Sequence, residues 1–206
     1  PFRVLFPGGA RSEKGFLLSI ESCELLKEKK ELSLFIRSRI DKVSGPILTK
    51  RFESFDKTNI NVIDQDLSDS DFIGMIQEAD IIVIPYHSQA FRRRTSGILV
   101  DAVLLGKPVV VLNETWLSDI VDDQKTGVSV SADPESITKG VLEITQDYDS
   151  FIRNIEVARR SYLKANTWEA LLRHVCLLTG DKRYELEAHR IAAADRRSAE
   201  IRVLDA

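Results

Sequence analysis

The fold class is decided by the sequence IIVIP at residues 81–85. Four consecutive apolar residues that end at a proline are typical of a parallel strand buried on both faces. Residues 109–112, Val-Val-Val-Leu, repeat this pattern. Between the two runs, residues 96–105 have helical periodicity, and Gly106 and Pro108 then mark the helix end. A strand, a helix and a second buried strand indicate a βαβ unit with a parallel sheet.

The same alternation extends over most of the chain. Further strands are predicted at residues 2–6, 32–36, 61–63 and 127–130, and further helices at 14–29, 47–55, 68–79, 134–146, 150–165 and 167–178. Ser44-Gly45-Pro46 marks a turn, and Ser68 is a predicted N-cap with Asp71 three residues on. The inward stripe predicted for that helix consists of Phe72, Ile73, Ile76 and Ala79.

We therefore predict an α/β fold, a Rossmann-like three-layer domain with a six-stranded parallel sheet, over residues 1–180. Residues 181–206 are dense in both signs of charge and are predicted to form an exposed or partner-packed helical tail. The thin apolar stripe of this tail consists of Leu186, Ile191, Ala194 and Ile201.

The composition excludes several classes of function. Lys and Arg total 29 against 32 Asp and Glu, a net charge of −3, so no nucleic-acid partner is expected. Cys23 and Cys176 are predicted to be buried free thiols rather than a disulfide, and no Cys/His cluster predicts zinc. No apolar run approaches the roughly 20 residues of a membrane span and no signal-peptide pattern is present, so a cytoplasmic location is predicted.

The loop after the first strand is the first candidate ligand-binding segment. Gly8 and Gly9 allow the backbone to approach a ligand closely, and Arg11 and Lys14 place positive charge at a helix start, which favours anions. The spacing fits neither GxGxxG nor a P-loop. A flexible turn with solvated cations is the alternative interpretation.

The loop between residues 85 and 97 is the second candidate. Three arginines, the last of them Arg94, precede Thr95, Ser96 and Gly97 at a predicted helix start. Guanidinium groups, hydroxyls and unpaired backbone N–H groups at one helix start would form a second anion cradle facing the first. The alternative is a solvated basic loop.

Two further positions complete the candidate site. Asp101 lies one turn into the helix after Gly97 and could accept hydrogen bonds from sugar hydroxyls, unless it is an ordinary exposed carboxylate. Asn113, Glu114, Thr115 and Trp116 follow a strand and could contact a ligand, although Trp116 is expected to pack. Two anion cradles and a carboxylate suit a diphosphate joined to a ribose, as in a nucleotide-sugar, and no metal is required because Arg, Lys and N–H groups can balance its charge.

A family resemblance rests on several of these segments in order. Residues 6–15, 79–86, 97–111 and 127–134, and finally Asn166-Thr167-Trp168, together resemble the carboxyl-terminal, donor-binding half of GT-B glycosyltransferases of the family 4-like group. The most specific pieces are GARSEKG at residues 9–15 and DAVLLGKPVV at residues 101–110. The resemblance covers roughly residues 1–178 and excludes the tail.

The resemblance implies roles for individual residues. Arg11 and Lys14 would bind the donor diphosphate and offset the charge of the leaving group, and Asp101 would hold the ribose in place of a family Glu. The amides at Thr95, Ser96 and Gly97 would hold phosphate and sugar. The first Glu of the family motif falls on Arg93, a departure that concerns the sugar contact.

The implied reaction is transfer of a sugar from a nucleotide diphosphate-sugar to an acceptor with retention of configuration. The acceptor site would lie on a missing amino-terminal half, so this domain is expected to be inactive alone. Two alternatives are a non-catalytic domain of this fold that acts as a protein interaction module, and a nucleotide-sugar 2-epimerase. The epimerase is disfavoured because its acidic and histidine residues are not found.

Overall fold

A computed structural model describes residues 1–40 and 45–192 of the chain. The chain divides into two compact units, Pro1–Ala158 and Arg159–Ala206, and the long helix α8 (Tyr148–Ala165) contributes to both. Each unit is described separately below. The predicted boundary at residue 180 stays a prediction about domain organisation.

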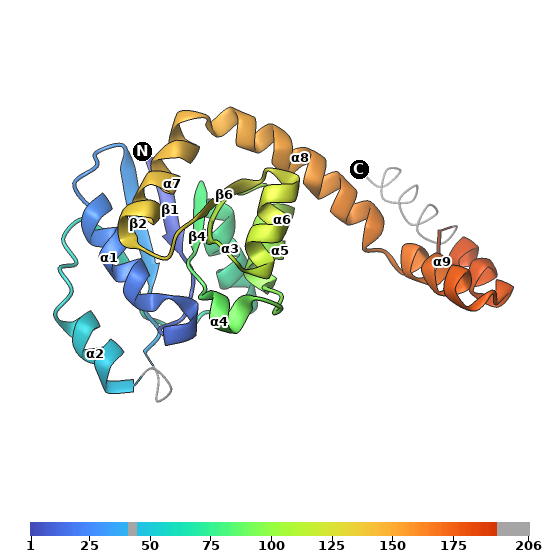
Figure 1. Ribbon diagram of the computed structural model, residues 1–206, viewed down its shortest axis with the longest axis horizontal. Helices are drawn as coiled ribbons and strands as arrows, with labels where there is room; N and C mark the ends of the chain where they lie inside the picture. Colours follow the sequence, from blue (N-terminus) through green and yellow to red (C-terminus); the bar gives the residue numbers. More distant parts are fainter. Residues whose placement is uncertain (41–44, 193–206) are drawn as a thin grey trace. The chain divides into compact units, whose positions relative to one another are not determined.

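The first unit is built on a six-stranded parallel sheet in the order β3-β2-β1-β4-β5-β6. Its strands are β1 (Phe2–Phe6), β2 (Leu32–Arg37), β3 (Ile60–Ile63), β4 (Ile81–Ile84), β5 (Val109–Leu112) and β6 (Gly127–Val130) (Figure 1). This arrangement confirms the predicted α/β class and sheet. The order reverses between β1 and β4, the place where α/β sheets bind ligands beyond the carboxyl ends of their strands.

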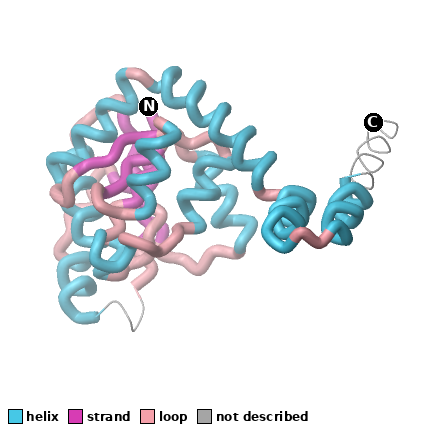
Figure 2. The backbone as a smooth tube through the Cα atoms, turned by 45° about the vertical axis from the view of Figure 1, so that its right-hand side comes forward, coloured by secondary structure: helices cyan, strands magenta, loops and turns pink. Residues whose placement is uncertain are grey.

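Helices cover both faces of the sheet, so the unit has three layers (Figure 2). One apolar core lies between the sheet and α1 (Phe16–Leu26), α2 (Gly45–Glu53) and α7 (Pro134–Gln146). The other lies against α3 (Asp69–Glu78), α5 (Gly97–Leu104) and α6 (Trp116–Gln124). Residues 81–84 are fully buried because their side chains alternate between the two cores, as a continuous apolar run requires.

Two predicted helix ends are confirmed by their local geometry. Ser68 is the N-cap of α3, and its Oγ accepts a hydrogen bond from Asp71 N. Gly106 has a φ of 73° directly after α5, a left-handed conformation that glycine adopts without steric cost. The predicted turn around Gly45 is partly described, because Ser44 lies outside the described residues.

Several details of the predicted elements were wrong, among them the end of the first helix, which lies at Leu26 rather than Lys29, and the short helix α4 (Ser88–Phe91), which was not predicted. The first helix begins at Phe16 rather than Lys14, because Gly15 is left-handed (φ 65°) and separates α1 from a 3-10 turn over Ser12–Lys14. Ile73 does not join the inward stripe of α3 and is 38% exposed. Helix α6 was missed: Thr115 and Ser118 form a capping box at its start, and Leu117 and Val121 bury its inner face.

The second unit contains α9 (Trp168–Thr179), with Thr167 as N-cap, and a helical stretch over residues 182–192. Of the predicted apolar stripe, Leu186 is exposed, while Ala194 and Ile201 lie outside the described residues. Cys23 in the first unit is buried and Cys176 is half-buried, and both are free. None of the helices in the described ranges has the length and apolar character needed to cross a bilayer.

Candidate functional site

The loops after β1 and β4 are joined at the carboxyl edge of the sheet. His87 N donates a hydrogen bond to Glu13 O at 3.0 Å, which ties the two loops together. Gly15 makes this approach possible, because a Cβ at that position would lie 1.9 Å from Pro85 O. The sequence therefore brings the two predicted anion-binding loops side by side, since β1 and β4 are neighbouring parallel strands.

Cations from both loops lie over the faces of two aromatic rings that pack against each other. The rings of Tyr86 and Phe91 lie 4.4 Å apart, and both are buried. Lys14 Nζ lies 5.5 Å from the centre of the Tyr86 ring, and the Arg94 guanidinium lies 4.6 Å from the centre of the Phe91 ring. These contacts stabilise positive charge beside a ring face.

The cations are close enough to repel one another. Burial lowers the pKa of Lys14 from its ordinary value, and Arg11, Arg37 and Arg94 lower it further, with only Glu13 acting in the opposite direction. We call Arg11, Lys14, Arg37 and Arg94 the cation cluster. Among the described residues, no carboxylate lies within ion-pair distance of any of the four.

The start of α5 follows the cluster directly. Ser96 is 5% exposed and its Oγ accepts a hydrogen bond from Leu99 N at 3.4 Å, so this predicted ligand-binding hydroxyl caps the helix. Thr95 and Gly97 are exposed, and a Cβ at Gly97 would have no atom within 4 Å. The first turn of α5 therefore presents backbone N–H groups on an open surface, where the helix dipole favours an anion.

The remaining predicted residues fall into two groups. Asp101 lies in the second turn of α5 and is half-buried, and burial raises the pKa of its carboxyl group. Gly8 and Gly9 are half-buried in the β1 loop. The segment after β5 is different: Trp116 packs on the core as expected, Thr115 is buried in the capping box, and Asn113 and Glu114 are exposed.

Sequence reasoning missed Arg37 and Ser38. Arg37 is the last residue of β2, the strand beside β1, and is half-buried. The available signal was a cationic residue at the carboxyl end of a predicted strand. Its significance depended on the strand order, because only a neighbour of β1 could bring that charge to the β1 loop.

Within residues 1–40 and 45–192, no group of three or more His, Cys, Asp or Glu side chains is placed to hold a metal ion. The prediction that the donor needs no metal stays a prediction. Chemically, the site is an open, cation-lined edge suited to a ligand with adjoining anionic groups.

A parallel sheet with this order and helices on both faces defines a Rossmann-like α/β domain, here with cations at its carboxyl edge. A family model described as "Glycosyl transferases group 1" matches residues 1–147. The chain therefore belongs to the glycosyl transferases group 1 family. A search of the curated proteins finds no match.

Solved structures share the fold at low sequence identity. A glycosyltransferase from Rickettsia africae matches with a TM-score of 0.64 and 20% identity, covering 89% of this chain and 48% of that one. Sucrose-phosphate synthase from Thermosynechococcus elongatus matches with a TM-score of 0.63 and 18% identity, covering 93% of this chain and 46% of that one. The chain thus spans about half the length of both proteins.

An isolated domain provides a third comparison. The C-terminal domain of a glycosyl transferase group 1 family protein from Francisella tularensis matches with a TM-score of 0.63 and 15% identity. The match covers 79% of this chain and 85% of that domain. At these identities the likeness establishes the fold, which is that of GT-B glycosyltransferases.

Proposed function

We propose that this chain is the carboxyl-terminal, donor-binding half of a family 4-like retaining glycosyltransferase. The observation that carries the proposal is the cation cluster, which lies at the switch in strand order, adjoins the start of α5 through Arg94 and has no carboxylate partner within residues 1–40 and 45–192. The ligand proposed for it is the diphosphate of a nucleotide-sugar. The family and the coverage of about half of two relatives support this assignment.

In the proposed reaction, the bond between the anomeric carbon and the diphosphate oxygen breaks, the acceptor oxygen bonds to that carbon, and the proton of the acceptor hydroxyl passes to the departing diphosphate. Arg11 and Lys14 offset the negative charge that develops on the leaving diphosphate. The N–H groups at Gly97 and the following turn bind a phosphate oxygen. Removal of one such charge-stabilising group costs about 10²–10³ in rate in enzymes with comparable oxyanion sites.

The other parts of the proposal follow from this role. Asp101 accepts hydrogen bonds from the ribose hydroxyls, and no metal is needed because the cation cluster balances the diphosphate charge. The acceptor is bound by an amino-terminal half, without which this domain binds its donor but transfers no sugar.

A thermal-shift panel of UDP, GDP, ADP and their sugar derivatives tests the proposal. At least one should raise the melting temperature at millimolar concentration, because a ligand that binds only the folded state stabilises it. By calorimetry, Arg11→Ala and Lys14→Ala should each weaken binding about tenfold to a hundredfold, since hydrogen bonds to charged groups are the strong ones. Lys30→Ala, which removes an exposed charge at the opposite edge of the sheet, is the matched control.

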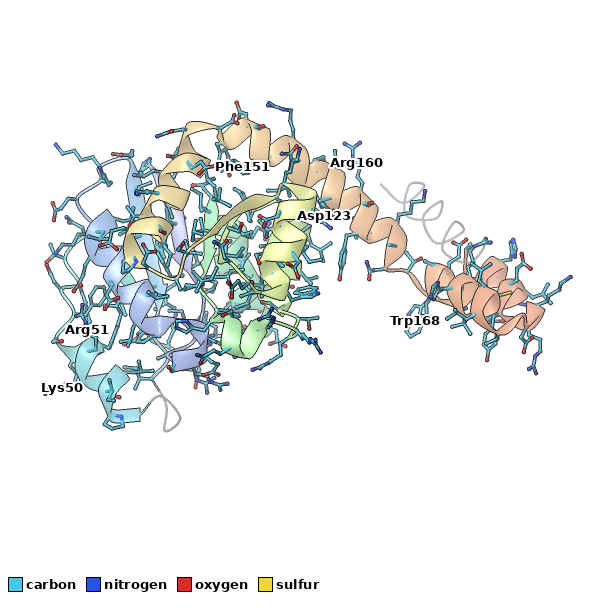
Figure 3. The ribbon with its side chains drawn as sticks, in the orientation of Figure 1. Lys50, Arg51, Asp123, Phe151, Arg160 and Trp168 are labelled. Carbon is cyan, nitrogen blue, oxygen red and sulfur yellow. The ribbon has the colours of Figure 1, made fainter. Side chains whose placement is uncertain are left out.

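A protein interaction role is the second candidate, and the second unit favours it. Trp168, Leu177 and Leu178 of α9 are 71%, 83% and 74% exposed (Trp168 is labelled in Figure 3). Large exposed apolar side chains on one helix are typical of protein contact surfaces. This role becomes the better explanation if no nucleotide in the panel shifts the melting temperature, or if a nucleotide binds the Arg11→Ala, Lys14→Ala double variant as well as it binds the wild type.

A further inference from the structure

Arg37 extends the candidate site to a third strand, β2, because it is the last residue of that strand. The carboxyl end of β2 lies next to the β1 loop, because β1 and β2 are neighbours in register from Phe2 and Leu32 onward. Backbone contact continues beyond the strands, where Ala10 N donates to Arg39 O at 3.4 Å. The Gly8–Gly15 loop is therefore held between the end of β2 and the loop after β4.

Two side-chain atoms at this strand end have no hydrogen-bond partner in the part of the chain that the structure describes. Arg37 Nε is buried and has no hydrogen-bond partner among the described residues. Ser38 is 2% exposed, and its Oγ is likewise without a partner in that part of the chain. Buried donors are normally satisfied, so two unsatisfied donors in sequence need an explanation. A ligand group that accepts hydrogen bonds at this edge supplies one.

The surroundings of the Arg37 guanidinium also favour a bound anion. Its guanidinium lies 5.4 Å from the centre of the Phe72 ring, which supports the cation from the α3 side of the sheet. Two residues further on, the carboxylate of Asp66 forms its ion pair with Arg39, at 2.9 Å, and acts on Arg37 only from beyond ion-pair distance, where it raises the pKa of Arg37 less than burial and Arg39 lower it. Arg37 instead repels Lys14, and this repulsion would be relieved by an anion bound between them.

We propose that Arg37 is an anion-binding residue of the donor site and donates hydrogen bonds to a phosphate oxygen of the bound diphosphate. This inference rests on the proposed function and extends it, because the diphosphate is then held from the ends of β2, β1 and β4. Arginine suits the position, since its planar group can donate to two oxygens while stacking on Phe72.

Calorimetry on the full chain tests the proposal by comparing Arg37, at the end of β2, with Arg39, in the loop that follows. The probes are the nucleoside diphosphate that binds the wild type best and inorganic pyrophosphate. Arg37→Gln should weaken the binding of both probes at least about tenfold, as expected for the loss of a charge-assisted hydrogen bond. Arg39→Gln removes the same formal charge from an ion-paired, exposed side chain and should change affinity less than about twofold. Arg37→Lys keeps the charge without the planar group and should lie between wild type and Arg37→Gln.

The outcomes separate this inference from the proposed function. If the wild type binds the nucleotide and Arg37→Gln and Arg37→Lys bind it equally well, the inference is overturned while the donor-binding role stands. Equal losses in Arg37→Gln and Arg39→Gln would also overturn it, because they would indicate a general charge effect. If the wild type binds pyrophosphate in an Arg37-dependent way but no nucleotide, the anion site is supported and the proposed function fails. Melting temperatures without ligand identify a variant that does not fold, and Arg37→Lys then decides the result.

Discussion

The cations at the two edges of the sheet differ in whether they have a carboxylate partner among the described residues. Toward the amino ends of the strands, Arg3 pairs with Glu78 at 2.9 Å and Lys27 pairs with Asp56, and between α1 and α2 Arg51 pairs with Glu24 at 2.6 Å (Arg51 is labelled in Figure 3). At the carboxyl edge, the cation cluster has no carboxylate within ion-pair distance among the described residues.

This difference does not come from a shortage of acidic residues. The chain has 32 Asp and Glu against 29 Lys and Arg, so partners are available in general. Like charges that are gathered without counter-charges raise the free energy of the folded chain. Their arrangement is explained when a ligand supplies the negative charge, as the proposed diphosphate would.

The largest expected effect comes from separating the two loops that hold the cluster. Gly15→Ala places a Cβ against Pro85 O at a positive φ, so we expect the free energy of unfolding to fall by about 3 kcal/mol. Urea denaturation measures the change. Gly74→Ala in α3, where a Cβ meets no atom within 4 Å, is the control and should not destabilise the chain. An unchanged stability for Gly15→Ala would contradict the described contact between the loops.

The next effect concerns the pH dependence of ligand binding. Burial and the neighbouring arginines lower the pKa of Lys14, so its ammonium loses the proton at a lower pH than an ordinary lysine, whose pKa is about 10.5. Affinity for the nucleoside diphosphate should fall, by about tenfold, as the pH rises through this lowered pKa, because the neutral amine attracts the diphosphate less. Calorimetry across the alkaline range should show a flatter profile for Lys14→Arg. Identical profiles would exclude Lys14 as the titrating group.

A smaller effect is expected at the ribose position. Asp101→Asn keeps the size of the side chain but removes its charge, so nucleoside diphosphate affinity should fall about threefold, in the range of one ordinary hydrogen bond. Inorganic pyrophosphate, which has no ribose, should bind the variant and the wild type equally. Loss of pyrophosphate affinity would assign Asp101 a structural role instead.

The smallest effect concerns the free energy of unfolding without ligand, and it compares an ion-paired cation with a member of the cation cluster. Arg51→Gln breaks an ion pair and should lower the free energy of unfolding by about 0.5 kcal/mol. Lys14→Met removes a repelled, half-buried charge and should raise it by about 0.5 kcal/mol, a small gain because solvent screens the charge. Thermal unfolding at low salt measures both. A loss of stability in both variants would contradict the claim that the cations of the cluster repel one another while Arg51 is stabilised by its ion pair.

Much of the fold follows from local sequence patterns. The buried runs at β4 and β5, the Ser68 N-cap and the Gly106 helix end are local signals, and the structure confirms each of them. Helix α6 also had a local signal, since Thr115, Leu117 and Val121 have the spacing of a capped amphipathic helix. It was missed because the segment was interpreted as a ligand-binding loop.

The site depended on information that no single segment contains. The β1 and β4 loops were each identified from their own glycines and cations, but their contact depends on β1 and β4 being neighbours. Arg37 required the further knowledge that β2 lies on the other side of β1. The Ser96 hydroxyl was predicted to contact the ligand, but its oxygen accepts a hydrogen bond from Leu99 N and so caps the helix, which is a local effect.

We expect the carboxyl edge of the sheet to bind a diphosphate through the β1 loop and the start of α5. Backbone amide shifts of the full chain, recorded by NMR during titration with a nucleoside diphosphate, test it most directly. We expect saturable shifts at residues 8–15 and 97–99, with the amides near Arg3 and Lys27, toward the amino ends of the strands, unchanged. Shifts confined to the second unit or to the amino edge would contradict it.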